Sequence, residues 1–247
     1  MDGIVIDRKD GIVRITLDRP EKRNAIDGSM FDALCEEFNS VAKNDDDRVV
    51  VLAGSGGAFS SGGDLAPSAP SGEDTMTMMR RISRAASALH ECPKPVIASV
   101  DGVAVGAGVS LVLGCDLVVA SDRARFSLMF VRNGLGLDMG ASWLLPRRLG
   151  WCRAAELALL GDWIDAATAQ SIGLVNRVVG VDDLAALSEE WAMRIASYSP
   201  RAVPSIQRSL ADASRLTRAE AREVEAQVQT ECAASPELRA AIEARRR

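Results

Sequence analysis

The sequence predicts an α/β fold built on a largely parallel sheet, followed by a helical C-terminal region. Short continuous apolar runs, such as residues 49–53, are typical of strands buried on both faces of a sheet. Between these runs lie segments whose apolar residues recur at helical spacing, such as residues 75–90. Strands and helices that alternate in this way indicate βαβ units, in which neighbouring strands are parallel.

The first half of the chain justifies this prediction element by element. Apolar residues on both sides of a Lys-Asp-Gly turn predict a β-hairpin from residues 4–6 and 13–17. A helix is expected to begin near Ser29, after a loop rich in charged and turn-forming residues. The later elements are expected as a strand at 49–53, a helix at 75–90, a strand at 95–100, a helical segment at 109–114 and a strand at 117–120.

Beyond residue 151 the sequence becomes mostly helical. Helices are expected over residues 153–160, 165–172, 182–196, 201–213 and 218–233. We therefore divide the chain into an α/β core, residues 1–190, and a C-terminal helical region, residues 191–247, without a linker that would make the two independent. The last helices carry more apolar residues than a short appendage could bury alone, which predicts that they mediate assembly.

The composition excludes several classes of function. A chain of 247 residues with 47% hydrophobic and 26% charged residues is typical of a soluble globular protein. Its net charge of -5 argues against a nucleic-acid partner, and no apolar run approaches the roughly 20 residues that span a bilayer. The first residues have no positively charged region leading into an apolar core, so a secretory signal is not expected, and the five scattered cysteines fit free thiols in a reducing compartment. We therefore expect a cytoplasmic protein with no membrane partner.

Two segments made largely of small residues follow predicted strands and lead towards helices. They are AFSSGGDL at residues 58–65 and VAVGAGVSL at residues 103–111. Either segment alone could simply permit tight turns and close packing. Two of them after neighbouring strands favour another interpretation, in which backbone N–H groups at helix N-termini converge on a carbonyl oxygen. The sequence thus predicts an oxyanion hole.

Competing catalytic motifs are missing from the sequence. GAGVSL lacks the third glycine of a dinucleotide fingerprint, and neither a phosphate-binding loop nor a nucleophile elbow occurs. The single histidine, His90, is interpreted as structural, so a Ser-His-Asp or Cys-His arrangement and a metal site are not expected. Chemistry in this chain is therefore expected to depend on carboxylates and backbone amides.

These segments together resemble the crotonase superfamily, the enoyl-CoA hydratase/isomerase family. The resemblance spans nearly the whole chain through six stretches in the family's order: LDRPEKRNAI, AFSSGGDL, PKPVIASVDGVAVGAGVSL, CDLVVASDRARF, GLDMGASWLLPRRLG and ALLGDWIDAATAQSIGLVNRVV. It implies the crotonase fold of repeated ββα units and an acyl-CoA thioester substrate, with coenzyme A entering as part of that substrate and no separate cofactor. It also implies a homotrimer, or a hexamer made as a dimer of trimers, held by the C-terminal helices.

The resemblance assigns the two oxyanion donors to the backbone N–H groups of Gly63 and Ala107. The family usually has glycine at the second position; alanine keeps the N–H but requires ordinary backbone torsions. In the loop RPEKRNAI, Lys22 and Arg23 would supply cations for the CoA phosphates, and Ala25 would contact the ligand through its backbone. The remaining residues expected to bind substrate are Ser61, Asp64, Leu65, Gly106 and Phe130.

The two glutamates that hydratases of the family use are replaced in this sequence. The family's pattern places them at Ser110 and Phe130, and neither side chain can transfer a proton in that role. Ordinary hydration is therefore not expected, and the ring of Phe130 would keep water from that side of the pocket.

A different acid, Asp138 in NGLGLDMGASW, follows in the next segment. Some branches of the family (Δ3,Δ2-enoyl-CoA isomerases, the ring 1,2-epoxyphenylacetyl-CoA isomerase and a dehalogenase) have an acid at the matching position. Apolar neighbours at Leu135, Leu137 and Met139 would raise the pKa of Asp138 and suit it to acid-base work. The alternative interpretation is that Asp138 serves a turn or caps a helix beginning in MGASWLL.

The sequence therefore predicts double-bond isomerisation of an enoyl-CoA through an oxyanion-stabilised enolate, with Asp138 as acid and base. Two alternatives stay open. One is hydratase-like or other crotonase chemistry, such as ring isomerisation or thioester cleavage; the other is a non-catalytic acyl-CoA-binding protein. Residues 67–89 are expected to shape the acyl pocket, with Met76, Met78 and Met79 as an adaptable lining or as core residues.

Overall fold

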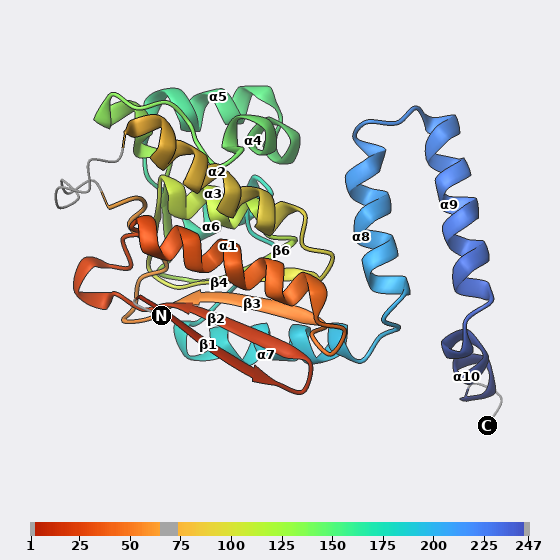
Figure 1. The fold of residues 1–247 in the computed structure, drawn as a ribbon. Helices are drawn as coiled ribbons and strands as arrows, with labels where there is room; N and C mark the ends of the chain where they lie inside the picture. The colour runs from red at the N-terminus through yellow and green to blue at the C-terminus, as the bar shows by residue number, and fades with distance from the viewer. Residues whose placement is uncertain (1–2, 65–73, 245–247) are drawn as a thin grey trace.

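The body of the protein is a six-stranded sheet in the order β1-β2-β3-β4-β6-β9 (Figure 1). The computed structural model describes residues 3–64 and 74–244. β1 and β2 form the predicted antiparallel hairpin, and every later neighbouring pair in this sheet is parallel. The strands are β1 (Ile4–Lys9), β2 (Ile12–Leu17), β3 (Val49–Gly54), β4 (Val96–Val100), β6 (Leu117–Ser121) and β9 (Arg177–Val179). The predicted α/β class and its largely parallel sheet are confirmed.

Helices cover both faces of this sheet, which explains the continuous apolar run in β3. Alternate residues of a strand point to opposite faces. Val50 and Leu52 join the cluster that includes α1 (Gly28–Lys43), while Val49 and Val51 join the cluster under α7 (Leu184–Ala196). α1 lies beside α2 (Thr75–His90), whose bounds match the predicted helix.

A small second sheet was not predicted. It has three strands in the order β5-β7-β8, formed by β5 (Val103–Val105), β7 (Arg125–Ser127) and β8 (Ile164–Asp165). The sequence predicted a glycine-rich loop at β5, and the helix predicted over residues 165–172 begins one residue later, directly after β8. Strands of two or three residues are too short to show a period of two, so only their pairing partners define them.

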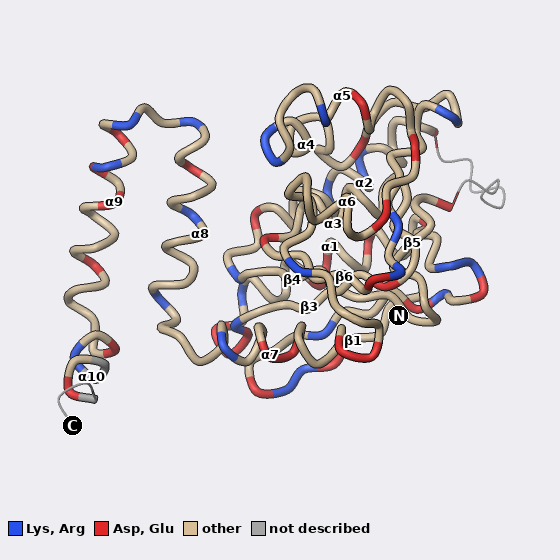
Figure 2. The backbone as a smooth tube through the Cα atoms, turned by 180° about the vertical axis from the view of Figure 1, so that it is seen from behind, with Lys and Arg blue, Asp and Glu red and all other residues tan. Residues whose placement is uncertain are grey.

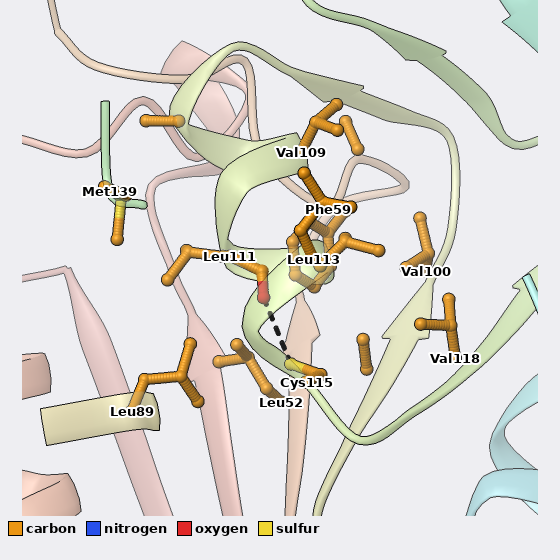
Figure 3. Close-up of a cluster of buried hydrophobic side chains, with 14 of the residues drawn as sticks. Leu52, Phe59, Leu89, Val100, Val109, Leu111, Leu113, Cys115, Val118 and Met139 are labelled. Carbon is orange, nitrogen blue, oxygen red and sulfur yellow. Dashed lines mark hydrogen bonds between the residues drawn. The ribbon is translucent and has the colours of Figure 1, made fainter. Parts of the chain in front are cut away.

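The middle of the chain builds the surroundings of this second sheet. Its helices are α3 (Ala107–Gly114), α4 (Ala141–Leu149), α5 (Trp151–Leu160) and α6 (Ala166–Ser171), with the short 3-10 turn η2 (Met129–Asn133). Two further 3-10 turns lie elsewhere: η1 (Pro20–Lys22) before α1 and η3 (Val181–Asp183) before α7. α3 lies inside the hydrophobic core (Figure 3), and its residues 107–113 are all buried. Leu111 and Leu113 pack there with Phe59. Because α3 is enclosed on its sides, its N-terminus is held in one place.

The C-terminal helices stand apart from the body in both views (Figures 1 and 2). They are α8 (Ala202–Ala213), α9 (Arg218–Ala233) and α10 (Pro236–Ala244). The proposed boundary at residue 190 falls inside α7, which packs on the sheet through the buried Ala192, so the body extends to the end of α7. Gln207 of α8 reaches back to the body, where its Nε2 donates to Asp116 Oδ2 over 3.0 Å. Within the described residues, no helix combines the length and apolarity needed to cross a bilayer.

Candidate active site

A cleft of about 830 Å³ opens where α1, α2, the start of α3 and η2 meet. Four of the predicted site residues, Gly63, Ala107, Phe130 and Asp138, line it together although they are far apart in the sequence. The other predicted residues that line it are Lys22, Ser61, Asp64 and Gly106. The structure therefore gathers the predicted donors and the predicted acid at one cavity.

The two small-residue segments meet through their backbones. The Val105 N–H donates to the Ser60 carbonyl over 2.9 Å, and Ser60 also pairs with Ala104 as an isolated bridge. Gly62 permits this approach, because its φ is +94° and a Cβ atom there would lie 2.7 Å from the Val105 oxygen. The same atom would lie 3.6 Å from the Ala107 nitrogen, so the residue before Gly63 and the second predicted donor are close neighbours.

The second donor lies at the first turn of α3. The first N–H groups of an α-helix have no partner within the helix and can bind a negative oxygen. Gly106 turns the chain into the helix with φ +51°, a region that side-chain-bearing residues rarely adopt. Ala107 itself has the helical backbone that alanine favours, which explains how alanine can replace the family's usual glycine here.

The loop before α1 is hydrogen-bonded to the first small-residue segment. The Ile26 N–H donates to the Gly62 carbonyl over 2.8 Å, and the Asp64 N–H donates to the Ile26 carbonyl over 2.8 Å, so these bonds flank Gly63 on both sides. The buried Asn24 donates from Nδ2 to the Ala58 carbonyl over 2.7 Å. Gly63 is thus held by backbone bonds from a neighbouring loop.

Charged residues that line the cleft form an ion-pair network that the sequence did not predict. Arg19 pairs with Asp27 over 3.0 Å and with Asp64 over 3.2 Å, and Lys22 pairs with Asp64 over 3.0 Å. Arg19 and Asp27 line the cleft but were not among the predicted site residues. Arg19 could have been proposed from the sequence, because it lies in the stretch LDRPEKRNAI, three residues before the predicted Lys22.

Some predicted binding residues lie elsewhere. Arg23 and Ala25 do not line the cleft. Arg23 is exposed, whereas Ala25 is buried with its carbonyl accepting from Arg19 Nη1 over 2.8 Å. Leu65 lies outside the described residues, as does most of the loop expected to shape the acyl pocket. On α2, Met78 and Met79 line the cleft, whereas Met76 is not among its lining residues and is exposed.

Asp138 lies on the turn between η2 and α4, and it does not cap that helix. α4 begins at Ala141, its N-cap is Gly140, and no side chain caps it. The helix-cap interpretation of Asp138 is therefore wrong. The Asp138 carboxyl instead accepts a hydrogen bond from the Ser110 hydroxyl, with 3.3 Å between Oγ and Oδ1.

The surroundings of Asp138 favour its protonated form. Burial raises the pKa of Asp138 to about 6, against the opposing effect of the Ser110 hydroxyl and of its own backbone. Phe130, at 7% exposure, lines the same cleft, and Met139 is buried directly beside Asp138 in sequence. Met139 has φ +50°, which is uncommon for a long side chain and marks a strained turn at this position. An acid with a pKa near neutrality can both accept and donate a proton.

Comparison with known proteins places this geometry in a family. The family model of enoyl-CoA hydratase/isomerase matches residues 7–246. The chain belongs to the enoyl-CoA hydratase/isomerase family. It is 37% identical over 202 residues to the 1,2-epoxyphenylacetyl-CoA isomerase of Escherichia coli, covering 80% of this chain and 77% of that protein. It is 38% identical over 188 residues to a probable enoyl-CoA hydratase of Rhodobacter capsulatus, covering 76% and 71% of the two chains.

Solved structures confirm the crotonase fold. A putative enoyl-CoA hydratase from Streptomyces coelicolor superposes with a TM-score of 0.92 at 32% identity, covering 98% of this chain and 92% of that one. Enzymes of the enoyl-CoA hydratase/isomerase family act on acyl-CoA thioesters. Its members carry both isomerase and hydratase names, so membership leaves the reaction to be argued from the side chains.

The raised pKa of Asp138 predicts that the free energy of unfolding falls as the pH rises and this carboxyl becomes charged. The folded state binds the proton more tightly than the unfolded chain, so the stability linked to Asp138 is fully present below pH 3.8 and is lost as the pH rises through about 6. Asp138→Asn removes the buried charge and is therefore expected to raise the free energy of unfolding at pH 8, by at most about 3 kcal/mol. At pH 4 it should have little effect. Chemical denaturation at both pH values measures the difference, and an equal effect at both would contradict the raised pKa.

Proposed function

We propose that this protein is an isomerase that moves a double bond within the acyl chain of an enoyl-CoA. The observation that supports this most is the carboxyl of Asp138, which lies in the same cleft as the Gly63 and Ala107 donors and has a pKa of about 6. The other two acids that line the cleft among the described residues, Asp27 and Asp64, are ion-paired with Arg19. The two hydratase glutamate positions are occupied by Ser110 and Phe130. One acid and two donors suffice to remove a proton from one carbon and return it to another.

The proposed reaction needs no separate cofactor, because coenzyme A enters as part of the substrate. The thioester oxygen of a 3-enoyl-CoA accepts hydrogen bonds from the N–H groups of Gly63 and Ala107. The Asp138 carboxylate takes a proton from carbon 2, and the electron pair of that C–H bond moves towards the oxygen as a dienolate. The protonated Asp138 then returns the proton to carbon 4, which leaves the double bond between carbons 2 and 3. No water or electron is consumed.

The position of Phe130 argues against hydration. A Cβ atom on Gly106 would lie 3.7 Å from two carbon atoms of the Phe130 ring, so the ring sits beside the turn that carries the second donor. A hydratase needs a carboxylate that holds the attacking water, and an apolar ring offers it no hydrogen bond. Isomerisation needs no bound water and is therefore compatible with the Phe130 ring at this position.

Ring isomerisation is a second candidate reaction for the same site. It is favoured by the similarity to the Escherichia coli 1,2-epoxyphenylacetyl-CoA isomerase. The apolar lining by Phe31, Met78 and Ile82 would accept either an aliphatic or an aromatic acyl group.

Replacing Asp138 tests the proposed proton shuttle. Asp138→Asn keeps the shape of the side chain and loses the acid-base group, so conversion of 3-enoyl-CoA to the conjugated 2-enoyl-CoA should fall by about 100- to 10,000-fold. Binding of a saturated acyl-CoA, measured by calorimetry, should survive. Wild-type turnover by the variant would contradict the proposal, and binding without turnover in the wild type would favour the non-catalytic alternative.

Two substitutions at Gly63 test the oxyanion assignment. Gly63→Pro removes the N–H donor, whereas Gly63→Ala keeps it, and a Cβ atom there meets no other atom within 4 Å. The proline variant should lose about 100- to 1,000-fold in turnover, and the alanine variant should lose much less. Turnover by steady-state kinetics distinguishes them, and circular dichroism shows whether both are folded. Equal activity in the two variants would contradict the assignment.

The C-terminal helices are proposed to assemble the protein into a trimer or a hexamer. Ile206 and Leu210 on α8 are 61% and 72% exposed in the single chain, and Leu238 and Ile242 on α10 are also exposed. Large apolar side chains gathered on helices that stand apart from the body need a covering surface.

Light scattering tests this assembly. At micromolar concentration the mass should be three or six times the chain mass of 26.3 kDa. Leu210→Glu places a charge on the exposed face and should lower that mass, whereas Val5→Glu, at a half-exposed position of β1, should leave it unchanged. A monomeric wild-type protein would contradict the proposed assembly.

A further inference from the structure

The Ser110 hydroxyl lies between two acceptors that belong to different parts of the site. Its Oγ is 3.3 Å from Oδ1 of Asp138 and 3.4 Å from the carbonyl oxygen of Gly106. Ser110 is only 1% exposed and lies on α3, one turn after the proposed donor Ala107. A buried hydroxyl with two acceptors can rotate to donate to either one.

We propose that Ser110 is a positioning residue that holds Oδ1 of Asp138 and so leaves the other carboxyl oxygen, Oδ2, to exchange the proton with the substrate. This inference rests on the proposed function of Asp138. Ser110 occupies a position where hydratases of the family have a glutamate, so the same place on α3 serves a different purpose here.

The two acceptors match the two states of the proton shuttle. While Asp138 is a carboxylate, the hydroxyl donates to Oδ1, because hydrogen bonds to charged acceptors are the stronger ones. When Oδ2 takes the proton from carbon 2 of the substrate, the C–H bond breaks and its electron pair passes to the dienolate. The charge on Asp138 is then lost, and the hydroxyl can turn to the Gly106 carbonyl. Return of the proton from Oδ2 to carbon 4 restores the carboxylate and its bond to Ser110.

This arrangement also links the acid to the oxyanion hole. The Gly106 carbonyl that accepts from Ser110 Oγ also accepts from the Ser110 N–H over 3.0 Å, and Gly106 precedes Ala107 directly. The first turn of α3 therefore carries one oxyanion donor and the group that orients the acid. Because α3 is buried along its length, both are fixed relative to each other.

Burial and the Ser110 bond dominate the pKa of Asp138 among the groups around it. Two charged side chains on the neighbouring elements are engaged elsewhere: Arg148 of α4 donates to the Cys115 carbonyl over 2.8 Å at the far end of α3, and Arg132 of η2 pairs with Asp162. His90 of α2 lies against Gly140, and burial lowers the pKa of His90 and favours its neutral form. The charged groups that line the same cleft are Arg19, Lys22, Asp27, Asp64 and Arg81.

Ser110→Ala tests the proposal through the pH dependence of the reaction. Without the hydroxyl the carboxylate loses a donor, so the acid limb of the kcat/KM profile should move to higher pH by about 0.5 to 1 unit. The rate on the plateau should fall by roughly 2- to 10-fold. Ser110→Thr keeps a hydroxyl and should restore the position of the limb. The carboxyl resonance of Asp138 in protein labelled with 13C-aspartate, assigned by its loss in Asp138→Asn, should shift its midpoint in the same direction.

Ser188→Ala is the matched control. Ser188 is also a buried helical serine whose hydroxyl donates to the carbonyl four residues earlier, Leu184, over 2.9 Å, but it lies on α7 across the sheet. This variant should leave both the pH profile and the resonance midpoint unchanged. If it moves them as far as Ser110→Ala does, the effect is one of packing and the proposal is overturned.

A double substitution separates this proposal from the proposed function. If Ser110 acts through Asp138, Ser110→Ala should cost nothing further in an Asp138→Asn background. A multiplicative loss in the double variant would overturn the positioning role while leaving Asp138 as the shuttle. An unchanged acid limb and an unchanged resonance midpoint in Ser110→Ala would overturn it as well. Wild-type isomerisation by Asp138→Asn would instead remove the proposed function.

Discussion

The backbone hydrogen bond from Val105 to Ser60, 2.9 Å long, joins the two segments on which the rest of the site depends. It brings the loop that carries Gly63 against the turn that leads into α3. A side chain at Gly62 would collide with the Val105 oxygen, so the contact requires a residue without a Cβ atom. The buried flanks of α3 then hold the Ala107 end of the pair in place. Small residues in these two segments therefore allow their backbones to approach closely enough for the Gly63 and Ala107 N–H groups to lie in one site.

Two opposing effects set the pKa of Asp138 in this cleft. Burial raises its pKa to about 6, which disfavours the carboxylate that a base requires. The Ser110 hydroxyl opposes that effect by donating to Oδ1. Without this donor the pKa of Asp138 would be higher still, and a fully exposed carboxylate would be a weaker base. The pKa of Asp138 lies between these two cases, and an acid with such a pKa can both take a proton and return it.

Elements with strong local patterns were predictable from the sequence. α2 has the predicted bounds because its apolar residues recur at helical spacing, and β3 was predicted because residues 49–53 form a continuous apolar run between two covered faces. The second sheet was not predictable, since β5, β7 and β8 have two or three residues each and exist only through pairing with one another. The boundary drawn at residue 190 falls inside α7, whose Ala192 is buried against the sheet, because the apolar pattern of a helix does not show which surface it covers.

For the site, the sequence by itself determined which chemical groups are present: two runs of small residues, no glutamate at Ser110 or Phe130, and one acid at Asp138. Tertiary structure alone decided how they meet. The bond between Ser110 and Asp138 joins residues from two different elements, and the network around Arg19 joins η1 to the end of the first small-residue segment. The physical reason is that a hydrogen bond depends on distances of about 3 Å between atoms, whereas a sequence pattern records only spacing along the chain.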